Sequence, residues 1–473
     1  MLMNFRHITN RRTVFQICST ASLLWLLGGT LLADGRPLRC QITLDGVWHV
    51  KRLDSTGVDM ASLRREAEGP GKDWFSATMP AQVQEVLLQR GDIPDPRESR
   101  NCAETTWVFN HDWVYATQFF TPAAVSGGPV FLRCDGMDTL ATLYLNGQEV
   151  GQAANMFRRY AFDVGKQMAS VGETNTLMIR FHSPARFLEQ VRARSDSIED
   201  RTSKPFKHLR KSGSDFSSYL GAKPHYLKMG LFREVVLDIP GRAWLDDVWV
   251  RTELNEDLSE ARLVVQPTIS GSADRLRWVL RGPDGGVVSE GSGAPVPMTL
   301  DVPQPKLWWP HTHGTPQRYT LRIELMAGGQ LPDARDVAIG IRKIEPVLKD
   351  PATGEPRFAF KVNGQQIFLR GICWAPLEMI THVWNPDRAN ELLDLVVQGH
   401  MNVLRVWGEG ALPPEPFYDE CDRRGILVWQ DFMTGNGMDF PLDVPAYRAN
   451  LTAEIGDEIQ RLRNHPSVFL WCG

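Results

Sequence analysis

Residues 402–432 decide the fold of the C-terminal part of the chain, because they read as strand, helix and strand in turn. Asn402-Val-Leu-Arg-Val-Trp407 is an apolar run of strand length, and Ile426-Leu-Val-Trp-Gln-Asp-Phe432 is another. Between them, Glu415 to Arg424 has the length of a helix and is followed by Gly425, a typical helix stop. Apolar strands joined by helices indicate parallel β/α units.

The same alternation continues on both sides of this stretch. Ile367 to Trp374 and Ser467 to Cys472 read as further strands, and Asp387 to Gln398 and Val444 to Arg463 read as helices. Residues 358–473 thus hold four expected strands, whereas a closed (β/α)8 barrel needs eight strands and about 250 residues. We expect the first half of a TIM barrel (strands 1–4), in a chain that is a fragment or a truncated product. The alternative is a small open α/β sheet.

Upstream of this region the sequence predicts two β-sandwiches. Residues 40–240 carry short alternating runs, and Asn146-Gly147 between two of them is a strong hairpin signal. Residues 243–347 alternate in polarity with Gly and Pro at about ten-residue spacing, which favours an immunoglobulin-like sandwich. The charge-rich stretch Arg186 to Lys211 is predicted to be a long loop or a solvated helix.

The N-terminus resembles an export signal. Arg6, Arg11 and Arg12 precede an uncharged apolar run, and Ala33 is a plausible small residue before a cleavage point. We expect residues 1–33 to be a signal peptide and the mature chain to be secreted or periplasmic. An uncleaved N-terminal membrane anchor and a twin-arginine signal are the alternatives.

Composition excludes several classes of protein. Lys+Arg 52 against Asp+Glu 56 gives a net charge of −4, which argues against a nucleic-acid-binding surface. The chain has no Walker loop, no Rossmann glycine pattern and no Gly-x-Ser-x-Gly. The six cysteines after Cys18 contain no Cys-x-x-Cys, so at most one disulfide is expected. His311-Thr-His313 is a weak metal signal, and we expect neither a metal nor another cofactor.

Candidate binding residues follow from the rule that β/α barrels build their sites at the C-terminal ends of the strands. That rule selects Trp374, Arg405, Trp407, Glu409 and Asp431. Carboxylates and arginine bind hydroxyl groups and tryptophan offers a flat face, so this set suits a polyhydroxylated ligand. The alternatives are core packing for the two tryptophans, an ion pair of Arg405 with Asp431 or Glu409, and a loop cap for Asp431.

Blocks spread over nearly the whole chain resemble glycoside hydrolase family 2, and within it the β-mannosidase-like group. Two blocks resemble the family's jelly-roll, galactose-binding-like sandwich, two resemble the end of its immunoglobulin-like domain, and four resemble the opening half of its catalytic barrel. In chain order they are Gly136–Gly147, Asn155–Tyr160, Leu307–Pro310, Gly340–Lys343, Asn363–Gly371, His400–Gly408, Gly425–Met433 and Asn464–Gly473.

The resemblance implies a retaining exo-β-glycosidase that removes a terminal β-linked sugar from oligosaccharides. Such enzymes use two carboxylates about 5 Å apart, an acid/base and a nucleophile. In the family both glutamates lie beyond the position of Gly473, so no catalytic residue is assigned here and residues 358–473 are an incomplete catalytic domain. We expect the chain as written to be inactive.

The sequence also departs from the family pattern. Ser217 to Tyr226 stands where β-mannosidases usually carry a Trp-Asp-Trp motif, and Cys373 stands where Asn is commoner. Glu409 lies between two glycines where a third glycine is commoner, and its carboxylate suits the ammonium of an amino sugar. An exo-β-glucosaminidase, or another family 2 β-glycosidase, is therefore an alternative. A non-catalytic carbohydrate-binding protein is the alternative from another class. The sequence leaves the oligomeric state open.

Overall fold

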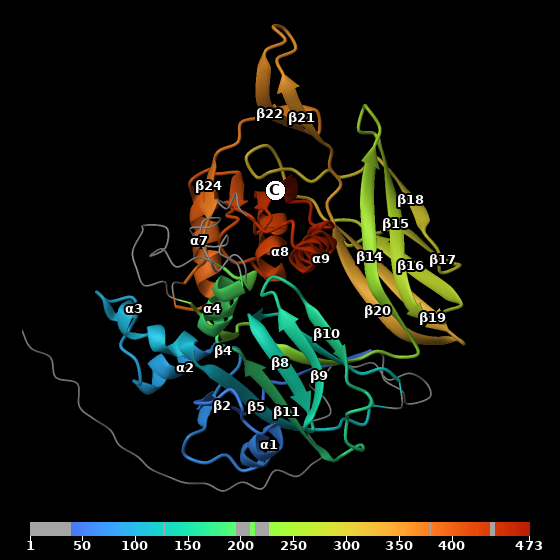
Figure 1. Cartoon of the computed structure of the whole chain (residues 1–473). Coiled ribbons are helices and arrows are strands. Elements are labelled where there is room, and N and C mark those ends of the chain that lie inside the picture. Colours follow the sequence, from blue (N-terminus) through green and yellow to red (C-terminus); the bar gives the residue numbers. More distant parts are fainter. Residues whose placement is uncertain (1–38, 126–127, 195–208, 213–226, 379, 436–439) are drawn as a thin grey trace, which may run out of the picture.

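The computed structural model describes residues 39–125, 128–194, 209–212, 227–378, 380–435 and 440–473. Within these residues the chain forms three parts that follow one another in sequence (Figure 1). They are an N-terminal sandwich drawn in blue and green, a second sandwich in yellow-green to gold, and a β/α part in orange and red. The expected signal peptide over residues 1–33 lies outside the described residues.

The N-terminal sandwich contains a four-stranded sheet in the order β1-β13-β6-β10 and a six-stranded sheet in the order β3-β2-β5-β11-β8-β9. A short three-stranded sheet, β4-β12-β7, lies beside them. The strands are β1 (Cys40–Thr43), β2 (Trp48–Leu53), β3 (Phe75–Ala77), β4 (Ala81–Gln82), β5 (Asp112–Phe120), β6 (Phe131–Cys134), β7 (Met137–Asp138), β8 (Leu140–Leu145), β9 (Gln148–Ala154), β10 (Tyr160–Asp163), β11 (Thr174–Phe181), β12 (Gly230–Leu231) and β13 (Val235–Ile239).

The inward faces of these strands form one hydrophobic core that includes the fully buried Trp48, Trp113 and Phe181. The predicted hairpin is confirmed: β8 and β9 are joined by Asn146 and Gly147, both with positive φ, as a two-residue hairpin requires. Helical segments flank the sandwich. They are α1 (Met60–Glu68), α2 (Val83–Arg90), α3 (Asn101–Glu104), the 3-10 turn at Thr106–Asn110, and α4 (Pro184–Arg194).

The second sandwich pairs a three-stranded sheet, β14-β15-β18, with a four-stranded sheet, β17-β16-β19-β20. Leucines and valines from both sheets meet in a single core. The long antiparallel ribbon of β14 and β15 runs the height of this part in Figure 1. Its strands are β14 (Ala243–Leu254), β15 (Glu260–Gly271), β16 (Arg275–Arg281), β17 (Val287–Gly293), β18 (Met298–Pro303), β19 (Tyr319–Ala327) and β20 (Gln330–Ile339).

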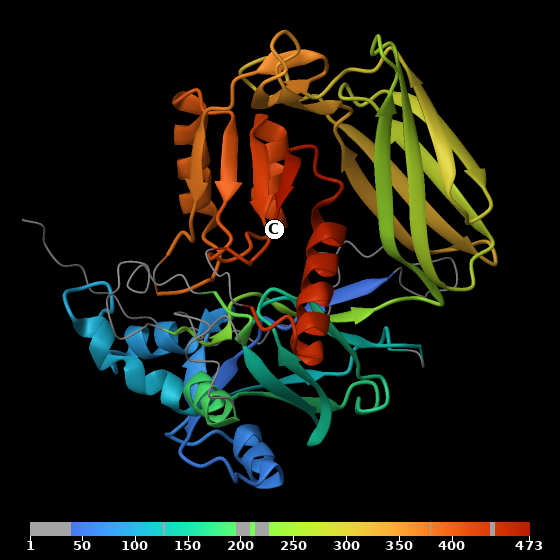
Figure 2. The same cartoon turned by 45° about the horizontal axis from the view of Figure 1, so that its top comes forward.

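The third part is a parallel sheet in the order β24-β25-β26-β27, with helices between the strands. An antiparallel hairpin with a third short strand precedes it. The elements are β21 (Ile344–Lys349), β22 (Pro356–Val362), β23 (Gln365–Ile367), β24 (Gly371–Trp374), α7 (Pro386–Gln398), β25 (Val403–Val406), α8 (Glu415–Arg424), β26 (Leu427–Asp431), α9 (Pro445–Leu462) and β27 (Val468–Cys472). Figure 2 shows α9 reaching from this sheet to the N-terminal sandwich.

The second sandwich is joined to the β/α part by specific polar contacts. Trp308 is fully buried and its indole Nε1 donates to the Asp422 carbonyl over 2.9 Å. The side-chain amide of Asn464 accepts from Val250 N (3.0 Å) and donates to the Val248 carbonyl (2.7 Å), both on the outer edge of β14. Asn464 therefore takes the place of a neighbouring strand at that edge.

Two sequence predictions need correction. Residues 367–374 are not one strand, because β23 pairs antiparallel with β22 and β24 pairs parallel with β25. Between them the side chain of Asn402 bonds Arg370 N and the Phe368 carbonyl, which ends the first strand. The stretch 186–211 is predicted to be a long loop or a solvated helix. It begins within the helix α4, and residues 195–208 lie outside the described residues, but Arg210 and Lys211 at its end are buried.

Two further observations concern cysteines and helix length. No disulfide joins any two of the six cysteines in the described residues, although the sequence allowed one. Among the described helices, none has the length and apolar character that crossing a membrane requires.

Candidate functional site

Parallel pairing brings the predicted site residues to one edge of the β24–β27 sheet. Cys373 pairs with Arg405, and Arg405 pairs with Trp429 on the next strand. Asp431 closes β26, where it pairs with Cys472. Because parallel strands end at the same side of a sheet, the loops after Trp374, Val406 and Asp431 all leave from this edge.

Arg405 and Asp431 form the centre of this edge. The guanidinium Nε lies 3.0 Å from both carboxylate oxygens and Nη2 lies 2.9 Å from Oδ2. The guanidinium also lies over the Trp429 ring, 5.1 Å from its centroid. Hydrogen bonding to the Asp431 carboxylate raises the pKa of Arg405. The alternative of an ion pair with Asp431 is therefore what the structure shows.

The pair is unequally exposed, and this decides what it can do. The side chain of Arg405 is 43% exposed, whereas that of Asp431 is 5% exposed. Asp431 also accepts from Gly408 N over 3.3 Å, which holds the turn after β25 against it. The Nη1 group of Arg405 makes no hydrogen bond among the described residues. Arg405 therefore offers oriented N–H groups to a ligand, while Asp431 fixes their direction.

The other three predicted residues are placed differently. Trp374 is buried, and its ring lies 4.7 Å from that of Phe417, which favours core packing for this tryptophan. Trp407 is partly exposed and its backbone N–H donates to the Trp374 carbonyl over 3.1 Å. Glu409 is 3% exposed, so its carboxylate is not presented at the surface.

A small pocket of about 30 Å³ lies beside Trp374 and is bounded by Arg233 and His382. This volume is enough for about one or two water molecules and far too small for a sugar ring. Burial lowers the pKa of Arg233 to about 10, and burial holds the pKa of His382 well below its ordinary value. The pocket is therefore an internal junction between the strand-end loops and the N-terminal sandwich.

The N-terminal sandwich reaches this edge through residues that sequence reasoning missed. Arg210 donates from Nε to Glu454 on α9 (2.8 Å) and from Nη2 to the carbonyl of Met433 (3.0 Å), in the loop after β26. Asn155 Nδ2 also donates to Glu454, over 2.8 Å. One sequence signal existed: Glu454 stands at helical spacing with Leu451, on the face of α9 that is buried.

A second contact connects the sandwich to the loop after β24. The Gln82 side chain accepts from His382 N over 2.7 Å and donates to Asp138 over 3.0 Å. Thr381 Oγ1 donates to Glu85 over 2.7 Å. Asp138 also binds the buried ammonium of Lys211. The position of the first strand-end loop is thus set by the N-terminal sandwich.

Comparison with known proteins agrees with this architecture. Residues 48–233 match the family description "Glycosyl hydrolase 2 galactose-binding domain-like", and residues 243–342 match "Glycosyl hydrolases family 2". β-Mannosidase B of Aspergillus clavatus is 32% identical over 424 residues, which are 86% of this chain and 49% of that protein. β-Mannosidase B of Emericella nidulans is 31% identical over 411 residues, 85% of this chain and 48% of that protein.

Solved structures show the same relationship. The β-D-mannosidase of Dictyoglomus thermophilum has a TM-score of 0.80 and 28% identity, over 92% of this chain and 52% of that one. The exo-chitosanase of Amycolatopsis orientalis has a TM-score of 0.67 and 19% identity, over 91% and 49%, and shares the fold. The chain spans about half the length of these proteins.

The two sandwiches and these relatives define the class: the chain belongs to glycoside hydrolase family 2. Within that family it stands in the β-mannosidase-like group, because its curated relatives and a solved neighbour are named β-mannosidases.

Proposed function

We propose that this chain is the sugar-recognising part of a retaining exo-β-glycosidase of the β-mannosidase type, which removes a terminal β-linked sugar from oligosaccharides. The observation that carries the proposal is the Arg405–Asp431 pair at the strand ends, with a half-exposed guanidinium held in one direction. Trp407 lies next to it and is partly exposed. The names of the relatives support mannose as the sugar.

The proposal includes the domain organisation. Residues 40–240 form the sugar-binding-like sandwich, residues 243–347 the immunoglobulin-like sandwich, and residues 358–473 the first half of a (β/α)8 barrel. Four parallel strands with intervening helices support this last assignment. Residues 1–33 serve as an export signal that directs the chain out of the cytoplasm.

We further propose that these 473 residues bind the sugar without hydrolysing it. A retaining mechanism needs two carboxylates about 5 Å apart that both reach the sugar. At the described strand ends the Asp431 carboxylate forms an ion pair with Arg405, and Glu409 is buried. Neither is available as a nucleophile or as an acid/base.

The amino-sugar alternative rests on Glu409. A carboxylate that binds the ammonium of a glucosaminide must reach the ligand, and Glu409 is turned into the protein. Its burial therefore favours the mannoside over the glucosaminide.

The test is a binding titration of the 473-residue protein with methyl β-D-mannopyranoside, beside an assay for 4-nitrophenol release from the aryl mannoside. We expect saturable binding without release. Arg405→Ala should weaken binding at least about tenfold, the value of a charge-assisted hydrogen bond. The matched control is Arg370→Ala, which removes an exposed arginine at the other end of the same sheet.

Three results would contradict the proposal. Tighter binding of methyl β-D-glucosaminide than of the mannoside would favour the amino-sugar reading. An equal loss of binding affinity in the Arg405 and Arg370 variants would show that the strand ends do not bind the sugar. Release of 4-nitrophenol by the purified protein would contradict the absence of hydrolysis.

A further inference from the structure

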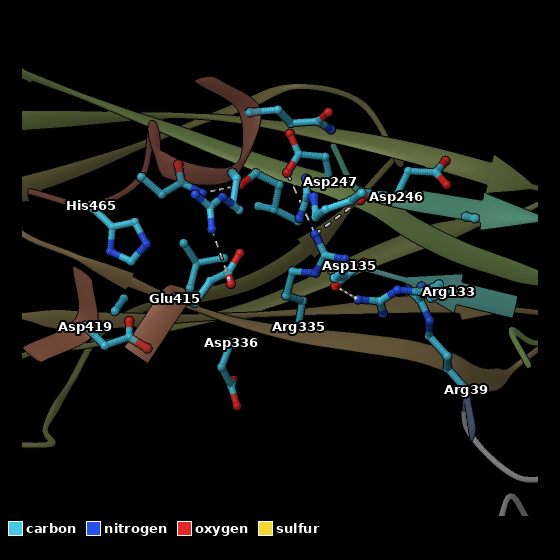
Figure 3. A pocket seen from close by; sticks show the side chains of 18 of the residues that line it. Arg39, Arg133, Asp135, Asp246, Asp247, Arg335, Asp336, Glu415, Asp419 and His465 are labelled. Carbon is cyan, nitrogen blue, oxygen red and sulfur yellow. Dashed lines mark hydrogen bonds and ion pairs between the residues drawn. The ribbon is translucent and has the colours of Figure 1, made fainter. Parts of the chain in front are cut away.

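A cavity of about 480 Å³ lies where the three parts of the chain meet (Figure 3). Arg133 and Tyr160 of the N-terminal sandwich line it, together with Asp247 and Arg335 of the second sandwich. Glu415 and other residues of α8 and α9 line it from the β/α part. The cavity thus lies on the helix side of the parallel sheet. Its volume is in the range of small-molecule sites.

Most charged groups around this cavity are already paired. Arg133 lies 3.2 Å from Asp135, and Asp247 binds Arg463 and lies 3.8 Å from Arg335. Figure 3 shows Asp247 and Arg335 facing each other, and Arg133 facing Asp135. These pairs cancel much of the charge, so the lining has little net preference for an ion of either sign.

Three side chains in the lining have hydrogen-bonding groups without a partner among the described residues. The Arg461 side chain is 4% exposed. Its Nη1 donates to the Pro413 carbonyl and lies 3.8 Å from Glu415, but its buried Nη2 makes no hydrogen bond among the described residues. Arg159 makes neither a hydrogen bond nor an ion pair within the described part of the chain. Asp419 has no hydrogen bond or ion pair there either, but it is exposed, and a carboxylate oxygen of it lies within 4.8 Å of His465 and of Asp422. A buried N–H group without an acceptor is costly and calls for a ligand or water.

The ligand must accept hydrogen bonds from two guanidinium groups and donate one to a carboxylate. A hydroxyl group does both, whereas an inorganic anion at the guanidinium groups is repelled by Asp419. Burial raises the pKa of Asp419; the neighbouring His465 opposes this shift, and the Asp422 carboxylate adds to it. Tyr160 adds an aromatic ring to the lining, which suits the apolar face of a sugar.

We propose that the junction cavity is a second saccharide site, which holds a mono- or disaccharide through Arg159, Arg461 and Asp419 and so connects sugar binding to the packing of the three parts. This inference does not depend on the proposed function, because none of its residues belongs to the strand-end edge.

The test uses the 473-residue protein carrying Arg405→Ala, so that binding at the strand-end edge is already weakened. D-mannose and inorganic phosphate are titrated separately, and binding is followed by ligand-observed NMR. We expect saturable binding of D-mannose. Arg159→Ala should weaken it about tenfold, and Asp419→Asn should weaken it as well. Arg388→Ala is the control, since Arg388 pairs with Glu391 on α7 and does not line the cavity.

Three outcomes would overturn the inference. Phosphate binding that Arg159→Ala abolishes, with no binding of D-mannose, would make the cavity an anion site. Equal D-mannose affinity in the Arg388 and Arg159 variants would place the sugar elsewhere. No binding of D-mannose at all, with normal binding at the edge of the parent protein, would refute the second site and leave the proposed function intact.

Discussion

Arg210 and Glu454 form an ion pair that is closed to solvent on both sides, with side chains 1% and 0% exposed. Arg210 belongs to the N-terminal sandwich and Glu454 to α9, and 243 intervening residues separate them along the chain. The guanidinium is surrounded by the rings of Phe157, Phe440 and Tyr447. One side chain thus fixes the sandwich to the helix that precedes β27.

Removing one partner of this pair should be costly. In Arg210→Ala the Glu454 carboxylate stays buried without its cation, and breaking a buried pair in this way costs about 3–5 kcal/mol. Urea unfolding measures the loss. The control is Arg158→Ala, which breaks a partly exposed pair between the same two parts and should cost less than about 1 kcal/mol. Similar losses in both variants would show that the burial of Arg210 has no energetic role.

Gly425 ends α8 with φ +69° and supports the docking of the second sandwich. Its carbonyl accepts from His311 N over 2.9 Å. A Cβ at this position would lie 2.7 Å from His311 N and 2.9 Å from the Trp309 carbonyl oxygen. Gly425→Ala should therefore lower the free energy of unfolding by more than the roughly 1 kcal/mol that the left-handed conformation alone costs.

The matched control for that substitution is Gly91→Ala. Gly91 ends α2 with φ +77°, and a Cβ there would meet nothing within 4 Å. We expect only the conformational cost, about 1 kcal/mol. If both substitutions had the same effect in thermal unfolding, the close contacts of Gly425 with His311 and Trp309 would contribute nothing to the loss of stability.

Glu458 should make stability depend on pH. It is buried on α9, and neither carboxylate oxygen makes a hydrogen bond among the described residues. Burial raises its pKa to about 8, against the attraction of Arg461. The folded chain therefore keeps a proton that the unfolded chain, with a pKa of about 4.3, has already released. The free energy of unfolding must fall as the pH rises between these two values.

Glu458→Gln removes this proton and should be more stable than the parent at pH 8.5, by at least about 1 kcal/mol. The difference should shrink toward pH 5. Urea unfolding at both pH values measures it, with Asp457→Asn at the neighbouring, partly exposed position as the control. A pH-independent difference between Glu458→Gln and the parent would show that Glu458 is ionised in the folded protein.

The Arg405–Asp431 pair should respond unequally to its two truncations. Arg405→Ala leaves a buried carboxylate whose remaining donor among the described residues is Gly408 N, and should cost about 1–3 kcal/mol of stability. Asp431→Ala leaves an arginine that already reaches water and should cost less. Chemical unfolding of both variants and the double variant gives the coupling. A larger loss from Asp431→Ala would contradict this assignment of burial.

The sequence predicted the β/α part closely because its signals are local. Proline at the start of α7 and α9 and glycine after α8 mark helix ends that the structure places within one residue or so. Strand-end geometry also predicted that Arg405 and Asp431 lie together, because adjacent parallel strands share an edge.

Tertiary contacts account for what the sequence did not predict. Arg210 sits in a polar stretch that reads as solvated, and groups distant in sequence, Glu454 on α9 among them, make its burial favourable. Glu409 follows a strand like the other candidates, yet it is buried, in a Gly-Glu-Gly turn that lies against Pro376. Local periodicity and spacing predict neither the burial of Arg210 nor that of Glu409.

The side-chain amide of Asn464 on the outer edge of β14 has a consequence for how the molecule behaves in crowded solution. An exposed edge strand presents free N–H and C=O groups on which another chain can add a strand. Asn464 occupies the N–H of Val250 and the carbonyl of Val248 in the middle of this twelve-residue strand. The docked β/α part therefore protects the second sandwich from edge-to-edge aggregation, a protection lost whenever the two parts separate.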